Sequence, residues 1–118
     1  MPELGKRVWS QNIVLSGRMT EDDWRAFLLE AISAMGMSAS GEAACWRYPT
    51  ENGKGGLGMT ICQPMTESFM VIDTWDAHDG AYLHISSCQR FNSADLTVPA
   101  QTFGLGIDLM GAAETLRL

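Results

Sequence analysis

The segment between residues 67 and 88 gathers most of the side chains in this sequence that could do chemistry. Ser68 and Cys88 are potential nucleophiles or proton donors, and Asp73 and His84 are potential acids or bases. Asp73 interrupts an apolar run, where a carboxylate is either a hydrogen-bonded residue at a strand end or a pocket group with a perturbed pKa. Taken singly, the serine is typical of a turn, the cysteine of a core, and the histidine of a hydrogen-bonded surface position.

Strands and short turns must position these residues. Apolar runs separated by polar or glycine-containing turns predict a meander of antiparallel strands. The expected strands are Ala44–Tyr48, Leu57–Cys62, Phe69–Thr74 and Tyr82–Ser87, and an Asn-Gly pair within residues 50–56 predicts a hairpin turn. Alternation along the last strand places His84 on the face that also carries Cys88.

The rest of the chain supplies the second layer. Residues 8–16 are a plausible strand, and a helix follows, with Thr20 as its N-cap and Gly36 as its C-terminal glycine. Its apolar residues form one stripe. Residues 95–102 are typical of a loop, and residues 105–116 of a helix weakened by glycine. This order predicts one domain, residues 1–118, with an α+β fold of two layers.

Composition excludes several function classes. The 118 residues include 14 acidic and 8 basic side chains, a net charge of −6 without any basic cluster, which disfavours a nucleic-acid partner. No apolar run is long enough to span a membrane, and the N-terminal residues lack a signal-peptide core, so a cytoplasmic location is expected. Three cysteines without a CxxC pair fit neither a disulfide framework nor a zinc site, so no metal is expected.

The reactive segment also carries a longer pattern. It reads Glu67-Ser68, a strand, Thr74-Trp75 and, after another strand, Cys88. This pattern resembles the prokaryotic S-adenosylmethionine decarboxylase proenzymes, which carry Glu-Ser-His, a few strand residues, His-Thr-Trp and then Thr-Cys-Gly. The spacings from Ser68 to Asp73 and from Ser68 to Cys88 match the family register without a gap. The resemblance covers roughly residues 5 to 92.

The resemblance implies a fold, a reaction and an assembly. The fold is an α+β sandwich with helices on one face of an antiparallel sheet, and the assembly is a homodimer with shared sites. Such a proenzyme cleaves itself between Glu67 and Ser68 and converts Ser68 into a pyruvoyl cofactor. That group accepts the electrons released when S-adenosylmethionine, or a related cationic amino acid, is decarboxylated for polyamine biosynthesis.

The resemblance also assigns roles to single residues. Cys88 is the expected acid that protonates the substrate carbon. Glu67, Phe69, Trp75 and His84 are the expected substrate-binding residues. Trp75 either stacks on a purine ring or packs in the core or at its rim. A tight turn at residues 65–68 would supply the strain that drives the acyl shift.

Three departures from the family pattern matter. Phe69 replaces the histidine after Glu-Ser, Asp73 replaces the histidine before Thr-Trp, and Gln89 replaces the glycine after the cysteine. The family histidine at the second position is implicated in processing. An ordinary Asp, with a pKa near 3.9, is a weaker base than a histidine near 6.5. Asp73 therefore either substitutes as a base with a raised pKa, or processing is lost.

Three functions remain open at this point. The first is a self-processing, pyruvoyl-dependent decarboxylase. The second is an unprocessed homologue without a cofactor, which binds or sequesters a nucleoside-like small molecule or regulates an active paralogue. The third is a catalyst that never cleaves and uses Asp73 or His84 as an acid or base. Cleavage between Glu67 and Ser68 discriminates the first from the other two.

Overall fold

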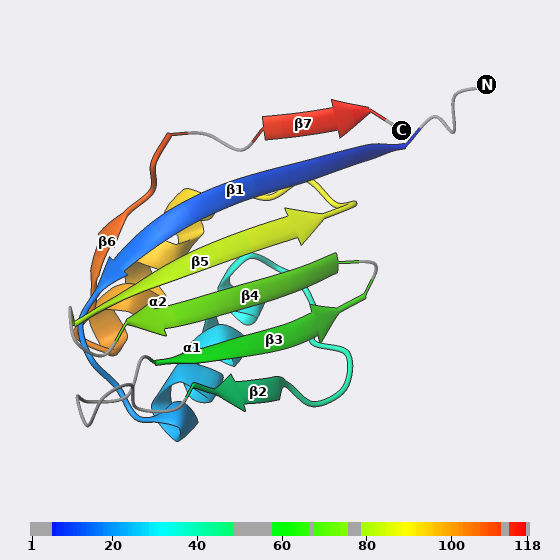
Figure 1. Ribbon diagram of the computed structural model, residues 1–118. Coiled ribbons are helices and arrows are strands. Elements are labelled where there is room, and N and C mark those ends of the chain that lie inside the picture. Colours follow the sequence, from blue (N-terminus) through cyan, green and yellow to red (C-terminus); the bar gives the residue numbers. More distant parts are fainter. Residues whose placement is uncertain (1–5, 49–57, 67, 76–78, 112–113, 118) are drawn as a thin grey trace.

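A computed structural model describes residues 6–48, 58–66, 68–75, 79–111 and 114–117 (Figure 1). Within these residues, seven strands form an antiparallel sheet in the order β2-β3-β4-β5-β1-β6, with β7 also paired to β1. The elements are β1 (Arg7–Ser16), α1 (Glu21–Ala34), β2 (Ala44–Arg47), β3 (Met59–Met65), β4 (Ser68–Trp75), β5 (Gly80–Ser87), a 3₁₀ turn (Ser93–Leu96), α2 (Thr97–Thr102), β6 (Gly106–Asp108) and β7 (Glu114–Arg117). Both helices lie on one face of the sheet, so the expected α+β class with two layers is confirmed.

The helix α1 follows the sequence signals closely. The Thr20 side chain accepts a hydrogen bond from the Asp23 backbone N–H, and three acidic residues occupy the first turn, where the helix dipole favours them. Gly36 follows the helix with a φ of +74°, a conformation that glycine adopts without strain.

The core lies between the helices and the inner face of the sheet. The apolar stripe of α1, which includes Trp24, Phe27 and Leu28, belongs to one buried cluster with strand residues such as Leu83 and Ile85. Alternate residues along the strands are buried, which defines an inner face toward the helices and an outer face. Register is therefore fixed, because a slip of one residue would move the whole apolar set to the outer face.

The hairpin of β3 and β4 positions Ser68. Met65 pairs with Ser68, so the connection between the strands is a tight turn, as expected at residues 65–68. The strand β3 extends past the predicted end at Cys62, and its outward-facing Pro64 lies beyond the residues that pair with β2. The Pro64 carbonyl accepts a hydrogen bond of 3.0 Å from the Ser40 N–H, so this proline stays bonded to a neighbouring segment although it has no N–H to donate.

The other end of this hairpin depends on a close backbone contact. Gly58 has a φ of +111°, and a Cβ at this position would lie 1.8 Å from the carbonyl oxygen of Thr74. The Thr74 hydroxyl accepts a hydrogen bond of 3.0 Å from the backbone N–H of Met59. A side chain at residue 58 would push β3 away from β4, so this approach requires glycine. The predicted Asn-Gly turn lies outside the described residues.

The expected loop at residues 95–102 is wrong. This stretch belongs to the 3₁₀ turn and α2, and Leu96 and Ala100 are fully buried in the core. The missed signal is Asn92, whose side chain accepts a hydrogen bond from the Ala94 N–H and caps the turn.

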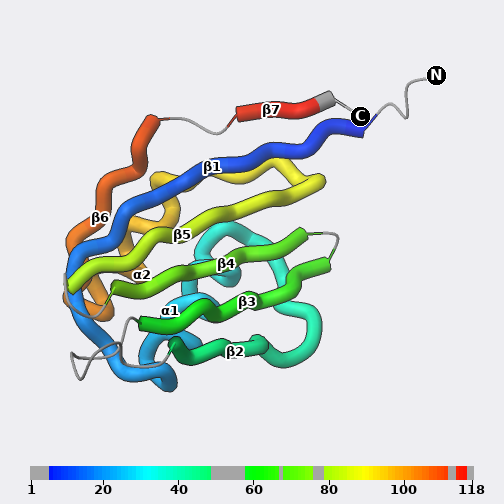
Figure 2. The backbone as a smooth tube through the Cα atoms, in the orientation of Figure 1, coloured from blue at the N-terminus to red at the C-terminus, as the bar shows by residue number. Residues whose placement is uncertain are grey.

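The expected helix at residues 105–116 is also wrong. The strands β6 and β7 pair with β1 instead, and Figure 2 shows both beside β1 at the edge of the sheet. Glycines at 106 and 111 weaken a helix, whereas the edge of β1 offers unpaired N–H and C=O groups. Tertiary pairing therefore outweighs the periodicity of this segment.

No helix among the described residues has the length and apolar character required to cross a bilayer. The same residues hold no group of three or more histidine, cysteine or acidic side chains that could bind a metal ion.

Candidate functional site

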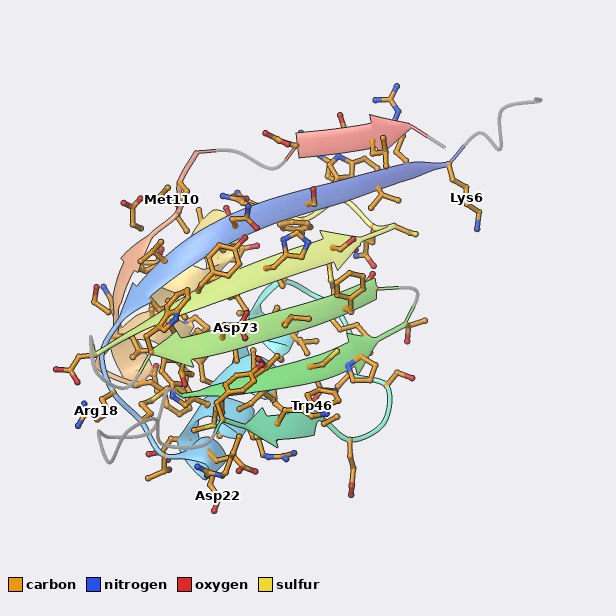
Figure 3. All side chains as sticks on the ribbon, viewed as in Figure 1. Lys6, Arg18, Asp22, Trp46, Asp73 and Met110 are labelled. Carbon is orange, nitrogen blue, oxygen red and sulfur yellow. The ribbon has the colours of Figure 1, made fainter. Side chains whose placement is uncertain are left out.

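The strand β4 divides the predicted site between the two faces of the sheet. Ser68 and the buried residues Met70, Ile72 and Thr74 point to the inner face, toward the helices. The residues between them, which include Phe69 and Asp73, point to the outer face. Figure 3 shows Asp73 over β4 on the face turned away from α1 and α2.

Ser68 belongs to a hydroxyl pair on the inner face, at one end of the sheet. Its Oγ donates a hydrogen bond of 2.8 Å to the Oγ of Ser87, the cross-strand partner at the end of β5. Ser87 is 1% exposed, and its Oγ also accepts a bond of 2.9 Å from the backbone N–H of Gln89. Its own hydroxyl points to the sulfur of Met37, 3.9 Å away.

A cavity of about 330 Å³ lies at the same end of the sheet. It is lined by Gly36, Met37, Ser38, Thr66, Cys88 and Gln89. Cys88 directly follows Ser87 and is partly exposed, so its thiol borders a space large enough for part of a small molecule. Two of the predicted reactive residues, Ser68 and Cys88, therefore both lie at this end of the sheet. Glu67 lies outside the described residues.

Asp73 is placed elsewhere. Its carboxylate accepts a short hydrogen bond from the Thr60 hydroxyl, which in turn is bonded to the Tyr48 hydroxyl. Asp73 is half-buried on the outer face and five residues along β4 from Ser68, a separation of about 17 Å for an extended strand. The structure does not bring Asp73 to the Ser68 hydroxyl within one protomer. The role of Asp73 as the processing base stays a prediction. No contact between Asp73 and Ser68 within the protomer supports it.

His84 also lies on the outer face, with Tyr82 and Ser86 as predicted. Cys88, expected on the same face, lies past the end of β5 and lines the other cavity. Its Nδ1 is 2.6 Å from Oδ1 of Asn12, and because an amide oxygen only accepts, Nδ1 carries the proton. His84 also lines a second cavity of about 210 Å³ with Ser10, Gln11, Asn12, Met110 and Glu114. His84 is therefore both a hydrogen-bonded histidine and a cavity-lining one, the two alternatives that the sequence left open.

Aromatic side chains complete the outer face. The ring of Phe69 lies 6.0 Å from that of His84, and Phe69 is 42% exposed. Trp75 is 50% exposed at the end of β4, so packing in the core is excluded for it. An exposed indole is free to stack on a planar ligand or on a partner surface.

A charged cluster outside this site joins α1 to the edge strand β2. Glu21 accepts a hydrogen bond of 2.8 Å from Arg25 and lies 2.9 Å from a guanidinium nitrogen of Arg47. The bond from Arg25 lowers the pKa of Glu21 below its ordinary value. Burial, together with the negative charge of Glu21, raises the pKa of the neighbouring Cys45 thiol. Cys45 is therefore a protonated structural thiol at neutral pH.

Sequence reasoning missed several residues of the site. Ser87, Met37 and Thr60 received no role, although each contacts a predicted residue or its partner. One signal was available for Ser87, which ends an inward-facing series that is otherwise apolar: Ala81, Leu83 and Ile85. A serine in such a series is an unusual buried polar group.

Comparison with known proteins gives a fold. No known protein-family profile matches the chain, and no curated protein sequence matches it. Among solved structures, it is similar to the crystal structure of the adenosylmethionine decarboxylase from Aquifex aeolicus VF5, with a TM-score of 0.57. The alignment covers 92% of this chain and 94% of that protein, at 14% sequence identity. The fold is therefore that of an S-adenosylmethionine decarboxylase, and the resemblance noted between residues 5 and 92 is confirmed at the level of the fold.

Proposed function

We propose that this protein is a self-processing, pyruvoyl-dependent decarboxylase of S-adenosylmethionine or a related cationic amino acid. The observation that carries the proposal is the inner hydroxyl pair. Ser68 is the first residue of β4, directly after a tight turn, with its Oγ fixed by Ser87 and with Cys88 next along the chain from that partner. The shared fold with an adenosylmethionine decarboxylase supports the same reaction class.

The first step uses only the chain itself. The Ser68 Oγ attacks the carbonyl carbon of residue 67, a C–O bond forms, the peptide C–N bond breaks, and the hydroxyl proton passes to the Ser68 nitrogen. Loss of the Ser68 Cα proton then expels the Glu67 carboxylate. Addition of water and release of ammonia leave a ketone at the new N-terminus of β4. No external oxidant or reductant is needed.

The residues at this end of the sheet fit such a group. A ketone conjugated with an amide supplies an electron sink for the decarboxylation of an amino acid. Cys88 borders the cavity nearby and is the residue we assign to protonate the substrate carbon after carbon dioxide leaves. The net charge of −6 favours a cationic substrate through long-range attraction.

The outer face supports the proposal of a homodimer. Among the described residues no helix covers this face, and it presents exposed large apolar side chains, including Val14, Phe69 and Trp75. Exposed apolar patches of this kind mark interaction surfaces. We propose that a second copy covers them, so that each protomer contributes residues to the partner's site. Val14→Lys should shift the mass measured by light scattering toward the monomer, whereas Glu30→Lys on the exposed side of α1 should not.

Intact mass under denaturing conditions tests the function. Two species, residues 1–67 and a ketone-blocked fragment 68–118, are expected from protein aged at neutral pH. Ser68→Ala should remain one species, since it removes the attacking oxygen. Cys88→Ala should cleave normally and then turn over poorly. A native chain that stays intact for days with Ser68 unmodified would contradict the proposal.

A second candidate function rests on the placement of Asp73. Its carboxylate lies on the outer face, held by Thr60 and remote from Ser68, where it could pair with a ligand cation without any cleavage. We propose this binding role for an unprocessed protein. Calorimetry with S-adenosylmethionine distinguishes the two, because the uncleaved Ser68→Ala variant retains ligand binding only if cleavage is unnecessary. Loss of that binding in Asp73→Asn would support the role of the carboxylate.

A further inference from the structure

Ser87 is an unusual side chain for its position. The other inward-facing residues of β5 are Ala81, Leu83 and Ile85, all apolar and almost completely buried. Ser87 is equally buried, yet it carries a hydroxyl group, which is costly to bury unless its hydrogen bonds are satisfied. A small apolar residue would fill the same space without that requirement. The hydroxyl therefore calls for an explanation beyond packing.

All the hydrogen-bonding capacity of Ser87 is used. A serine hydroxyl has one donor and two acceptor positions. In Ser87 the acceptor positions take the Ser68 hydroxyl, at 2.8 Å, and the Gln89 backbone N–H, at 2.9 Å. The donor position faces the sulfur of Met37, at 3.9 Å, a weak acceptor that does not compete for Ser68. The backbone of the segment after β5 thus fixes the orientation of the Ser87 oxygen.

This arrangement determines how Ser68 presents its oxygen. Because the Ser68 O–H donates to Ser87, the lone pairs of the Ser68 Oγ are left for attack. Rotation of the Ser68 side chain would break the bond and leave one of the two acceptor positions of the buried Ser87 oxygen unfilled, which is unfavourable. The oxygen is therefore held in one orientation at the start of β4, and positioning of this kind accounts for large factors in reaction rate.

We propose that Ser87 is a positioning residue for self-cleavage, which fixes the Ser68 hydroxyl in one orientation for the acyl shift at the bond between residues 67 and 68. The inference rests on the proposed function and adds a residue to it. In the step itself the Oγ–C bond forms, the C–N bond breaks, and the Ser68 hydroxyl proton passes to the Ser68 nitrogen. Ser87 neither gains nor loses a proton overall.

Four variants of the full-length chain test the proposal. Ser87→Ala removes the oxygen, Ser87→Cys keeps the volume but replaces the oxygen with a poor acceptor, and Ser87→Thr keeps the hydroxyl. Ser86→Ala is the matched control, because it removes the same atom from the preceding residue of β5, which points to the opposite face. Each chain is made by cell-free synthesis, and the uncleaved fraction is followed by intact mass. Circular dichroism of a parallel sample, recorded before and during denaturation, reports whether each variant is folded.

The expected result is a specific pattern of rates. Ser87→Ala and Ser87→Cys should slow cleavage by about 10- to 100-fold, as misplacement of a reacting group does. Ser87→Thr should restore the rate, and Ser86→Ala should leave it unchanged. The rescue by Thr separates positioning from a structural role, since the added methyl group disturbs packing more than the loss of the oxygen does.

Two results would overturn the inference in distinguishable ways. If the native chain cleaves and folded Ser87→Ala cleaves as fast or faster, the role of Ser87 is wrong and the proposed function stands. An equal slowing in Ser86→Ala and Ser87→Ala would have the same meaning. If the native chain never cleaves, both the proposed function and the role of Ser87 fail.

Discussion

The inner and outer faces of the sheet differ in what covers them and in the chemistry that they carry. The inner face is packed against α1 and α2, and two of its few polar side chains, Ser68 and Ser87, bond to each other. The outer face carries no helix in the described part of the chain, and it mixes aromatic side chains with Asp73 and His84. Alternation along one strand, β4, separates the two sets.

This difference shows how one short segment can serve two purposes. Residues next to each other in sequence point to opposite faces, so cleavage chemistry and ligand contact can be built from the same strand without competing for space. It also explains why the residues of one sequence motif, expected to form a single site, lie on both faces of the sheet. The motif spacing fixes distances along the strand, and the strand period then assigns each residue to a face.

The sharpest test of this separation compares Ser68→Ala with Asp73→Asn. We expect Ser68→Ala to abolish cleavage completely, because it removes the attacking oxygen. We expect Asp73→Asn to cleave at the native rate, because the carboxylate lies on the opposite face and is bonded to Thr60. Intact mass measures both. A block of cleavage in Asp73→Asn would show that the two faces act as one site.

A second test compares adjacent residues of β4 by their contribution to stability. Ile72 is fully buried on the inner face, and Ile72→Ala should lower the free energy of unfolding by about 2–5 kcal/mol. Val71 is half-buried on the outer face, and Val71→Ala should cost about 1 kcal/mol or less in the monomer. Urea denaturation measures both. Equal losses at all protein concentrations would contradict the assignment of an uncovered outer face.

A third test examines how β1 holds the segment that follows β6. The side chain of Gln11 is 5% exposed and donates hydrogen bonds of 2.6 Å to the backbone oxygens of Leu109 and Gly111. Gln11→Ala leaves these carbonyls without that donor, so a loss of about 1–3 kcal/mol is expected. Hydrogen exchange should accelerate in β6 and β7 but not in β3 and β4. Uniform acceleration would show that Gln11 supports the whole sheet instead.

The smallest expected effect concerns the opposite edge, where Glu21 joins α1 to β2. The pKa of Glu21 is lower in the folded protein than its ordinary value of 4.5, chiefly because of the hydrogen bond from Arg25. Its ionisation therefore stabilises the fold above about that pH, and the contribution disappears as the pH falls through the lowered value. Glu21→Gln should unfold more easily than the native protein at pH 7 and equally at pH 2, in thermal melts. A constant difference across this range would contradict the ionic contribution.

Much of the fold could be predicted from the sequence, because the signals for it are local. Thr20, the apolar stripe of α1 and the alternating strands β4 and β5 each specify their own structure within a few residues. The tail from residue 105 could not be predicted this way. Its strands form only because β1, about a hundred residues earlier, offers an edge for them.

The site was predictable in part for the same reason. The positions of Ser68 and Cys88 followed from spacing, and the structure brings both to one end of the sheet. The separation of Asp73 from Ser68 follows from an odd spacing along a strand, which was visible but not used. The partnership between Ser87 and Met37 joins β5 to the segment after α1, and such a contact depends on packing that no local pattern encodes.

The strand order has a consequence for the protein after cleavage. Residues 1–67 contain β1, α1, β2 and β3, and residues 68–118 contain β4, β5, α2, β6 and β7. In the sheet, β1 of the first fragment lies between β5 and β6 of the second, while β3 pairs with β4. The two fragments are therefore interleaved, and a cut would convert the chain into a tightly associated heterodimer. Unfolding would then become a dissociation, so its midpoint should rise with protein concentration.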